Sequence, residues 1–131
     1  MDLEFQKTVK KRGIKRFLNS FKYSVQGLIY AYKNEQSMTI HIIACIAVIS
    51  LGIFLKISYF EWLVCFILFG LVMATELINT SIEALVDLVT KEYHPLAKIA
   101  KDTASAAVFV FSIVAFVSGV IIFLPKIIEL L

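Results

Sequence analysis

The sequence lacks most of what a soluble nucleotide-binding enzyme needs. Its five glycines are scattered and form no G-x-G-x-x-G or Walker loop, which excludes a soluble-type kinase. The only arginines are Arg12 and Arg16, which disfavours a phosphatase or channel built on arginine clamps. Charged residues make up 18% of the 131 residues and apolar residues 60%. A soluble domain of this length cannot bury that much apolar surface, so residues 1–131 are expected to form a single integral membrane domain.

Cysteine is also sparse. Cys45 and Cys65 lie inside apolar segments and lack metal-ligand spacing, so we interpret both as packing residues and expect no disulfide framework. The N-terminal stretch is charged and polar, unlike a cleavable signal peptide. The first spanning segment is therefore expected to act as an uncleaved membrane signal.

Residues 1–33 form a basic segment, with eight lysines or arginines against two acids. Apolar residues recur in it at steps of three and four, at Ile14, Phe17, Phe21, Val25, Leu28 and Tyr32. This pattern predicts an amphipathic helix that lies on the surface of an anionic cytoplasmic leaflet. Nucleic-acid binding is the alternative, but no binding motif or aromatic platform accompanies the basic residues.

The rest of the chain predicts an all-α membrane fold with three transmembrane helices, at residues 38–55, 60–89 and 103–124. Ser37 is expected to cap the first of them. A short outer turn follows it, and residues 90–102 are expected to form a polar loop. Pro125 is expected to end the third helix.

The basic residues predict the orientation of these helices. The N-terminal segment holds eight and the 90–102 stretch three, so 11 of the 13 lie on one side. Lys56 and Lys126 lie on the other. The positive-inside rule then places the N-terminus in the cytosol and the C-terminus outside.

The second spanning stretch ends in polar residues that share one helix face. At 100° per residue, an arc of roughly 100° contains Glu76, Asn79, Thr80, Glu83 and Asp87. Counted from Trp62, Glu76 lies about 21 Å and Glu83 about 31 Å along the helix, so Glu76 stays in the hydrocarbon. A carboxylate there costs at least roughly 2.5–3.5 kcal/mol, which favours a functional role. The alternative, a helix end that simply reaches water, fits Asp87 but not Glu76.

These residue types suit phosphoryl transfer, which depends on positioning and charge neutralisation. Mg²⁺ usually takes one or two carboxylates plus phosphate oxygens, and Glu35 and Glu83 are candidates from separate segments. Lys101, beside Asp102, supplies a point charge for phosphate.

The buried carboxylate suits a different role. Glu76 is a candidate base for a lipid hydroxyl at headgroup depth. Asn79, one turn away, can hold either the lipid or the nucleotide.

Residues 76–87 resemble the signature of the prokaryotic diacylglycerol kinase family. That signature is Glu-x-aliphatic-Asn, Ser/Thr, Ser/Ala, aliphatic, Glu, two free positions, an aliphatic residue and Asp, and every defined position matches. Similarity extends to Glu92-Tyr93-His94, Ala100-Lys101-Asp102 and Ser105-Ala106-Ala107-Val108. The resemblance implies three transmembrane helices plus a surface helix in a bacterial plasma membrane, a homotrimer, and active sites shared between neighbouring subunits.

The resemblance also implies roles for single residues. By it, Glu35 and Glu83 would bind Mg²⁺, and Glu76 would be the catalytic base. The residues that would bind the ATP and its metal are Glu35, Asn79, Glu83, Asp87, Lys101 and Asp102.

The first spanning segment favours one branch of the family. Enterobacterial diacylglycerol kinases carry Arg-Gln-Glu where this chain has Thr39-Ile40-His41. The patterns similar to Gram-positive undecaprenol kinases are Glu35-x-x-Met38-x-x-His41, Leu96-Ala97-Lys98-x-Ala100-Lys101-Asp102 and Ile122-Phe123-Leu124-Pro125-Lys126. We therefore expect an ATP- and Mg²⁺-dependent kinase of undecaprenol at the cytosolic membrane face, with diacylglycerol as the alternative substrate. The expected lipid contacts are Glu76, Asn79, Met38 and Ile42.

Two other function classes remain as alternatives. Intramembrane carboxylates also form proton relays, so a small proton or ion carrier is possible. A relay should cross the membrane, however, and the first helix beyond His41 and the third helix have no ionisable residue before the outer boundary. A structural membrane scaffold would not need Glu76.

Overall fold

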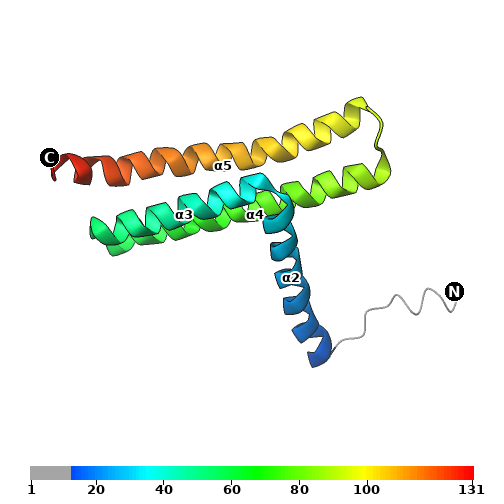
Figure 1. Cartoon of the computed structure of the whole chain (residues 1–131), viewed down its shortest axis with the longest axis horizontal. Coiled ribbons are helices and arrows are strands. Elements are labelled where there is room, and N and C mark those ends of the chain that lie inside the picture. The colour runs from blue at the N-terminus through cyan, green and yellow to red at the C-terminus, as the bar shows by residue number, and fades with distance from the viewer. Residues whose placement is uncertain (1–12) are drawn as a thin grey trace, which may run out of the picture.

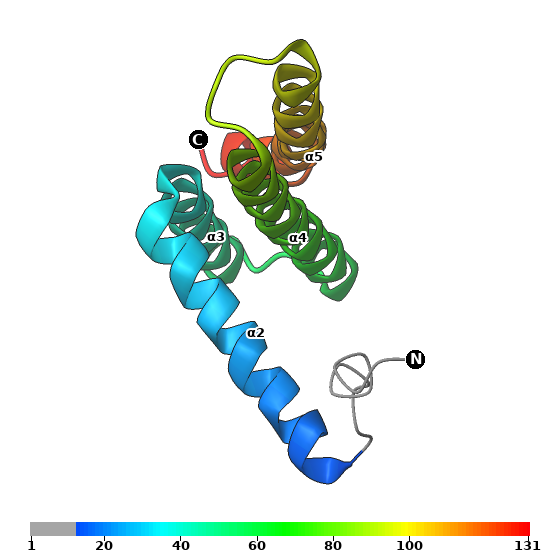
Figure 2. The same cartoon turned by 90° about the vertical axis from the view of Figure 1, so that its right-hand side faces the viewer.

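The computed structural model describes residues 13–131, which form four helices. These are α2 (Ile14–Asn34), α3 (Gln36–Phe54), α4 (Tyr59–Val89) and α5 (Pro95–Ile128). Helices α3, α4 and α5 run alongside one another, and α2 projects steeply from the start of α3 (Figure 1). Seen from the end of the bundle, α4 lies between α3 and α5 (Figure 2). Residues 1–12 of the expected surface segment lie outside the described residues.

Helices α3, α4 and α5 are each long and apolar enough to cross a membrane, with mean hydropathies of 2.2, 2.0 and 2.8 in their most apolar windows. This confirms the expectation of three such helices. Large apolar side chains cover their outer faces; Ile53, Phe54 and Phe116 are 67%, 73% and 73% exposed. Such surfaces are stable next to lipid chains or other apolar helices rather than water.

A tight turn joins α3 to α4. Lys56 has a φ of 50°, in the left-handed region, and the N–H of Ile57 donates to the carbonyl of Gly52 at 3.1 Å. The next helix opens with a capping box, in which Ser58 Oγ accepts from the Glu61 N–H and Glu61 Oε2 accepts from the Ser58 N–H. We call this end of the bundle the turn end.

The structure corrects the expected start of the third transmembrane helix. Helix α5 begins at Pro95 rather than Thr103, so much of the expected 90–102 loop is helical. Proline suits the first helical turn because its missing N–H would have no partner there. His94 Nδ1 accepts a hydrogen bond from the N–H of Leu96 at 3.2 Å and caps the helix.

Two expected helix boundaries are also wrong. Ser37 does not cap α3, because the helix begins at Gln36 with Glu35 at the cap position. Pro125 does not end α5, which continues to Ile128. The continuation brings Lys126 Nζ within 3.3 Å of Glu61 Oε2 on α4, an ion pair that joins the two helices.

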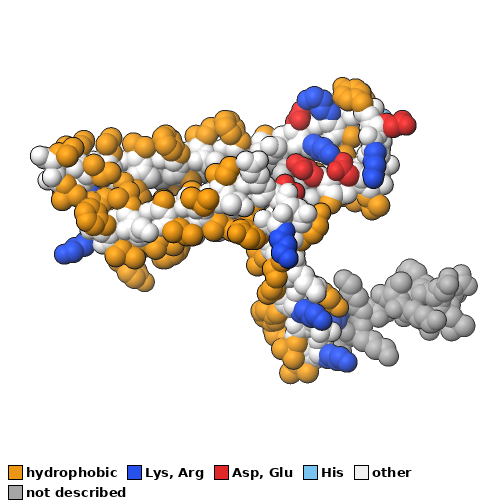
Figure 3. All heavy atoms as spheres, viewed as in Figure 1, with side chains coloured by type: hydrophobic (Ala, Val, Ile, Leu, Met, Phe, Trp, Pro, Cys, Tyr) orange, Lys and Arg blue, Asp and Glu red, His pale blue; other side chains and the backbone are white. Residues whose placement is uncertain are grey.

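The best-packed region lies at the turn end. A buried cluster there contains Ile57, Cys65, Ile122 and Phe123, with Trp62 packed against it. Cys65 therefore occupies a packing position. Charged side chains gather at the opposite end, where α2 meets α3 and α4 leads into α5 (Figure 3). We call this the charged end, and the candidate site lies there.

Candidate active site

The deepest polar residue of the site is Glu76 on α4. Glu76 is only 2% exposed, and its neighbours Asn79 and Thr80 are 7% and 8% exposed. The hydroxyl of Thr80 donates to the backbone carbonyl of Glu76 at 3.1 Å. The hydroxyl of Ser37, on α3, donates to Glu76 Oε1. The carboxylate is therefore held between two helices rather than exposed at a helix end.

Glu35 lies at the break between α2 and α3. Its backbone is extended, with φ −108° and ψ 116°, so the chain changes direction there and brings Glu35 towards α4. Burial raises the pKa of the Glu35 carboxyl above its ordinary value, and the negative charges of Glu83 and Glu76 raise it further. Three carboxylates from two segments thus interact electrostatically.

Asn79 connects the buried and the half-buried parts of the face. Its Nδ2 donates to Glu83 Oε1 at 3.2 Å. Its Oδ1 is buried and has no hydrogen-bond partner among the described residues. A buried acceptor without a partner is costly, so this oxygen is available to a ligand, to a metal-bound water or to another donor.

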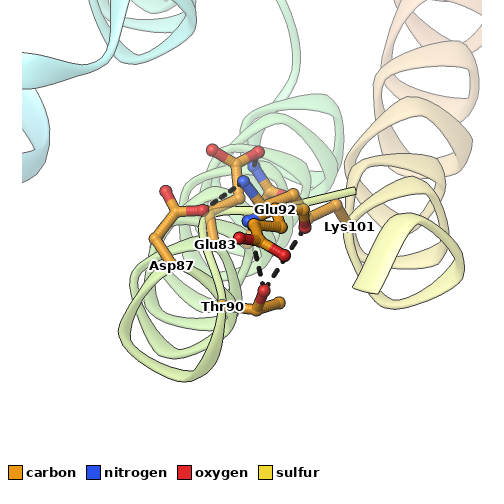
Figure 4. Close-up of polar contacts among 6 residues, drawn as sticks. Glu83, Asp87, Thr90, Glu92 and Lys101 are labelled. Carbon is orange, nitrogen blue, oxygen red and sulfur yellow. Dashed lines mark hydrogen bonds and ion pairs between the residues drawn. The ribbon is translucent and has the colours of Figure 1, made fainter. Parts of the chain in front are cut away.

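The face continues into the α4–α5 loop, where polar contacts are exposed. Lys101 Nζ on α5 lies 2.6 Å from Asp87 Oδ1 on α4, and this pair connects the two helices (Figure 4). In the same view, Thr90 Oγ1 accepts from the Glu92 N–H at 3.1 Å and shapes the loop. Lys101 is thus held by Asp87 rather than by its sequence neighbour Asp102.

Asp102 has a different partner. It forms an exposed ion pair with Lys98, one turn earlier on α5. The i,i+4 spacing of the two residues was the available signal for this contact. No such signal in the sequence indicated the contact between Ser37 and Glu76, because the two residues lie 39 positions apart in the chain.

The oxygen atoms of the site suit Mg²⁺ better than they suit a metal ion whose ligands all come from the protein. Within residues 13–131, no group of three or more His, Cys, Asp or Glu residues is arranged to hold a metal ion. Mg²⁺ usually binds one or two carboxylates together with phosphate oxygens and water. Glu35 and Glu83, with the free Oδ1 of Asn79 nearby, match that smaller set of protein oxygens.

The described residues enclose two cavities, of which the smaller borders the site. One of about 510 Å³ lies between α2 and α4 and is lined mostly by small residues, with Thr80 and Ala31 at its wall. The other, of about 600 Å³, is apolar, lies between α3, α4 and α5, and has His41 in its lining. Of the expected lipid contacts on α3, Met38 is 1% exposed and Ile42 is half-buried.

Comparisons with known proteins point to one family. The family model described as prokaryotic diacylglycerol kinase matches residues 22–123. The undecaprenol kinase of Bacillus subtilis is 40% identical over 116 residues, which cover 88% of this chain and 94% of that protein. The diacylglycerol kinase of Haemophilus influenzae is 39% identical over 115 residues, 87% of this chain and 98% of that protein. The diacylglycerol kinase of Escherichia coli K12 is 33% identical over 110 residues, 84% and 90% of the two chains.

Proposed function

Since the chain belongs to the prokaryotic diacylglycerol kinase family, we propose that it phosphorylates undecaprenol with ATP and Mg²⁺ at the cytosolic face of a bacterial plasma membrane. Membership of this family makes the protein a lipid kinase with ATP as its phosphoryl donor. A kinase replaces the alternatives of a proton carrier and a structural scaffold. The lipid, the metal, the roles of single residues and the assembly are the parts that we propose.

The observation that carries the mechanism is the gradient of burial along α4. Glu76 is buried, Glu83 is half-buried, and Asp87 is exposed, all on one helix face. Glu76 and Glu83 are seven residues apart, about 10 Å along the helix axis. One face of one helix can therefore meet an apolar lipid at one level and a polar nucleotide at the next.

Glu35 and Glu83 are the residues that would hold Mg²⁺, together with phosphate oxygens of the nucleotide. Bound there, the ion would neutralise charge on the phosphates and thereby lower the barrier to transfer. Asn79 keeps Glu83 in place through its Nδ2, and its Oδ1 can accept a hydrogen bond from metal-bound water. The mutual repulsion of Glu35, Glu83 and Glu76 favours a cation at this position.

Lys101, Asp87 and Asp102 would bind the rest of the nucleotide. Lys101 is a point charge for phosphate, and the Asp87 ion pair sets its position at the mouth of the site. The pair is exposed, so its contribution to stability is small and the ammonium can exchange partners when ATP arrives. Asp102 would act beside it from α5.

Glu76 would accept the proton of the lipid hydroxyl. The O–H bond of the alcohol breaks as its oxygen attacks the γ-phosphorus, and the bond from that phosphorus to the β,γ-bridging oxygen breaks to release ADP. A positioned base typically contributes about 10²- to 10⁴-fold to such a step. Asn79, one turn from Glu76, would bind the hydroxyl or the transferred group.

The choice of undecaprenol rests on α3. The chain has Thr39, Ile40 and His41 where the enterobacterial diacylglycerol kinases carry Arg-Gln-Glu, so a polar headgroup has fewer partners there. The buried Met38 and the half-buried Ile42 add apolar side chains near the start of the same helix. A polyprenol has one hydroxyl and no other polar group, which suits this lining.

We infer a homotrimer with α2 on the cytosolic membrane surface. The exposed apolar faces of α3 and α5 favour assembly, and α2 carries the amphipathic pattern of a surface helix. The charge distribution supports a cytosolic N-terminus and an external C-terminus. A reporter fused after Leu131 should be active outside the cell and one inserted at Pro95 inside; the reverse would contradict the site's access to ATP.

A competition assay tests the proposed function. Purified protein in detergent receives ATP and Mg²⁺ with undecaprenol and diacylglycerol at equal mole fractions, and both phosphorylated products are quantified. We expect undecaprenyl phosphate to dominate. A clear preference for diacylglycerol would refute the choice of lipid, and no phosphorylation of either lipid would refute the function.

A further inference from the structure

Ser37 makes a hydrogen bond that joins two helices at the candidate site. It is the second residue of α3, and its hydroxyl crosses to α4 and donates to Oε1 of the buried Glu76. Several other hydroxyls on the described helices bond back to their own helix: Ser50 donates to Ile46 O at 2.8 Å and Ser81 to Leu77 O at 2.9 Å. Ser37 instead gives its proton to a carboxylate on another helix.

The surroundings keep this contact in place. Met38, the next residue, and Ala31, near the end of α2, are each 1% exposed, so the joint between α2 and α3 is packed against its neighbours. Ser37 is itself half-buried. A hydrogen bond to a charged acceptor is stronger than one between neutral groups, and burial strengthens it further. The position of Ser37 is therefore set by packing, and its hydroxyl can in turn set the position of the carboxylate.

The chemical consequence follows from the symmetry of a carboxylate. Its two oxygens are equivalent until a donor occupies one of them. A donor on Oε1 fixes the rotation of the group and leaves Oε2 to accept a proton. A hydroxyl donor does this without a positive charge, so it weakens the base less than a lysine or arginine at the same place would.

We propose that Ser37 is a positioning residue of the kinase reaction, which binds Oε1 of Glu76 so that Oε2 receives the proton of the lipid hydroxyl. The inference rests on the proposed function, in which Glu76 is the base. The alcohol proton moves to Oε2, the alcohol oxygen bonds to the γ-phosphorus, and ADP leaves. The proton of Ser37 stays on Ser37 throughout.

Three substitutions at this position test the proposal. Ser37→Ala removes the donor; Ser37→Cys keeps nearly the same volume with a much weaker donor; Ser37→Thr keeps the hydroxyl. We expect the alanine and cysteine variants to lose about 10- to 100-fold in kcat, the size of one hydrogen bond to a charged group, with unchanged KM for Mg-ATP. Ser37→Thr should recover most of the rate. Ser50→Ala, which removes a hydroxyl from the same helix, is the matched control and should equal the wild type.

Thermal unfolding in detergent accompanies each rate measurement. A purely structural serine would lower the unfolding temperature, and the KM and kcat of the protein that remains folded would be those of the wild type. If Ser37→Ala does not fold, the cysteine variant decides in its place. A kcat within twofold of the wild type in the folded donor-free variant would overturn the proposal. The proposal would also be overturned if Ser37→Ala lost activity and Ser37→Cys retained as much activity as Ser37→Thr. The volume of the side chain, not its hydrogen bond, would then explain the loss in the alanine variant.

The failure of this inference differs from the failure of the proposed function. If the wild type and Ser50→Ala phosphorylate no lipid, the function is wrong. If both are active and Glu76→Gln is inactive, but Ser37→Ala equals the wild type, the function stands and only the role of Ser37 is refuted.

Discussion

Glu76 and Glu83 lie on one face of α4, and replacing each by glutamine should have opposite consequences for binding and turnover. Glutamine has nearly the same shape as glutamate and keeps an oxygen that can accept the existing hydrogen bonds. Those bonds come from Ser37 to Glu76 and, at 3.2 Å, from Asn79 to Glu83. Each substitution therefore removes one negative charge and little packing.

The expected magnitudes follow from the two proposed roles. Loss of a general base costs about 10²- to 10⁴-fold, which is about 2.7–5.4 kcal/mol of transition-state stabilisation. Proton acceptance matters only in the transition state, so Glu76→Gln should lower kcat and leave Mg-ATP binding unchanged. Glu83 lies about 10 Å further along the helix. Glu83→Gln removes one of two metal-binding charges and should weaken Mg-ATP binding about 10- to 100-fold.

Calorimetric titration with a non-hydrolysable ATP analogue and Mg²⁺ measures binding, and a coupled assay measures turnover. Glu129→Gln is the matched control, because Glu129 is an exposed carboxylate at the turn end, far from the site. It should behave as the wild type in both measurements. If Glu76→Gln loses nucleotide binding while Glu83→Gln retains it, the two roles have been assigned to the wrong residues.

Three further predictions concern packing, ionisation and assembly. A Cβ added at Gly52 would lie 2.8 Å from Trp62 Cη2, so Gly52→Ala should destabilise the protein by about 1–3 kcal/mol in thermal unfolding; Gly119→Ala, with open space around it, should not. Because the pKa of Glu35 is raised in the folded protein, the protonated carboxyl favours folding and its ionisation opposes it. The stability contributed by the protonated form is fully present below about pH 4.3 and is lost as pH rises through the higher folded-state pKa. Without Mg²⁺, Glu35→Gln should therefore melt above the wild type at pH 8, and a gap that did not shrink towards pH 4 would contradict this. Mixed oligomers of inactive Glu35→Ala and Glu83→Ala subunits should regain activity if one site draws on two chains; verified mixing without recovery would place each site within one chain.

The sequence predicted three long apolar helices because an uninterrupted apolar run long enough to cross a membrane can be counted directly in it. It placed α4 well, since the polar residues before and after it are clear signals. It failed at the start of α5, where the charges of residues 91–102 outweighed the Pro95 signal for a first helical turn. It also failed at Pro125, where a contact between Lys126 and Glu61 accompanies a helix that continues past proline.

The candidate site was predicted unevenly for a similar reason. The face of α4 could be drawn from the sequence, because 100° per residue fixes which side chains share a side. The structure agrees that Glu76, Asn79 and Thr80 are buried together. The contacts between helices could not be predicted, because Ser37 and Lys101 reach α4 only through the packing of whole helices. The ion pair between Lys101 and Asp87 is one such contact, and no signal in the sequence indicated it.

The partners along α4 vary with depth in a way that supports the proposed roles. The buried Glu76 faces a neutral hydroxyl, the half-buried Glu83 a neutral amide, and the exposed Asp87 an ammonium group. A cation next to a carboxylate opposes its protonation more strongly than a neutral donor does, and it also competes for any metal that the carboxylate binds, which a hydroxyl or an amide N–H does not. Asp87 is thus the carboxylate least suited to proton transfer or metal binding, and it is the one placed beside a lysine. A lysine introduced at Ser37 would impose the same pairing on Glu76, and we expect it to abolish turnover even where the chain folds and binds nucleotide.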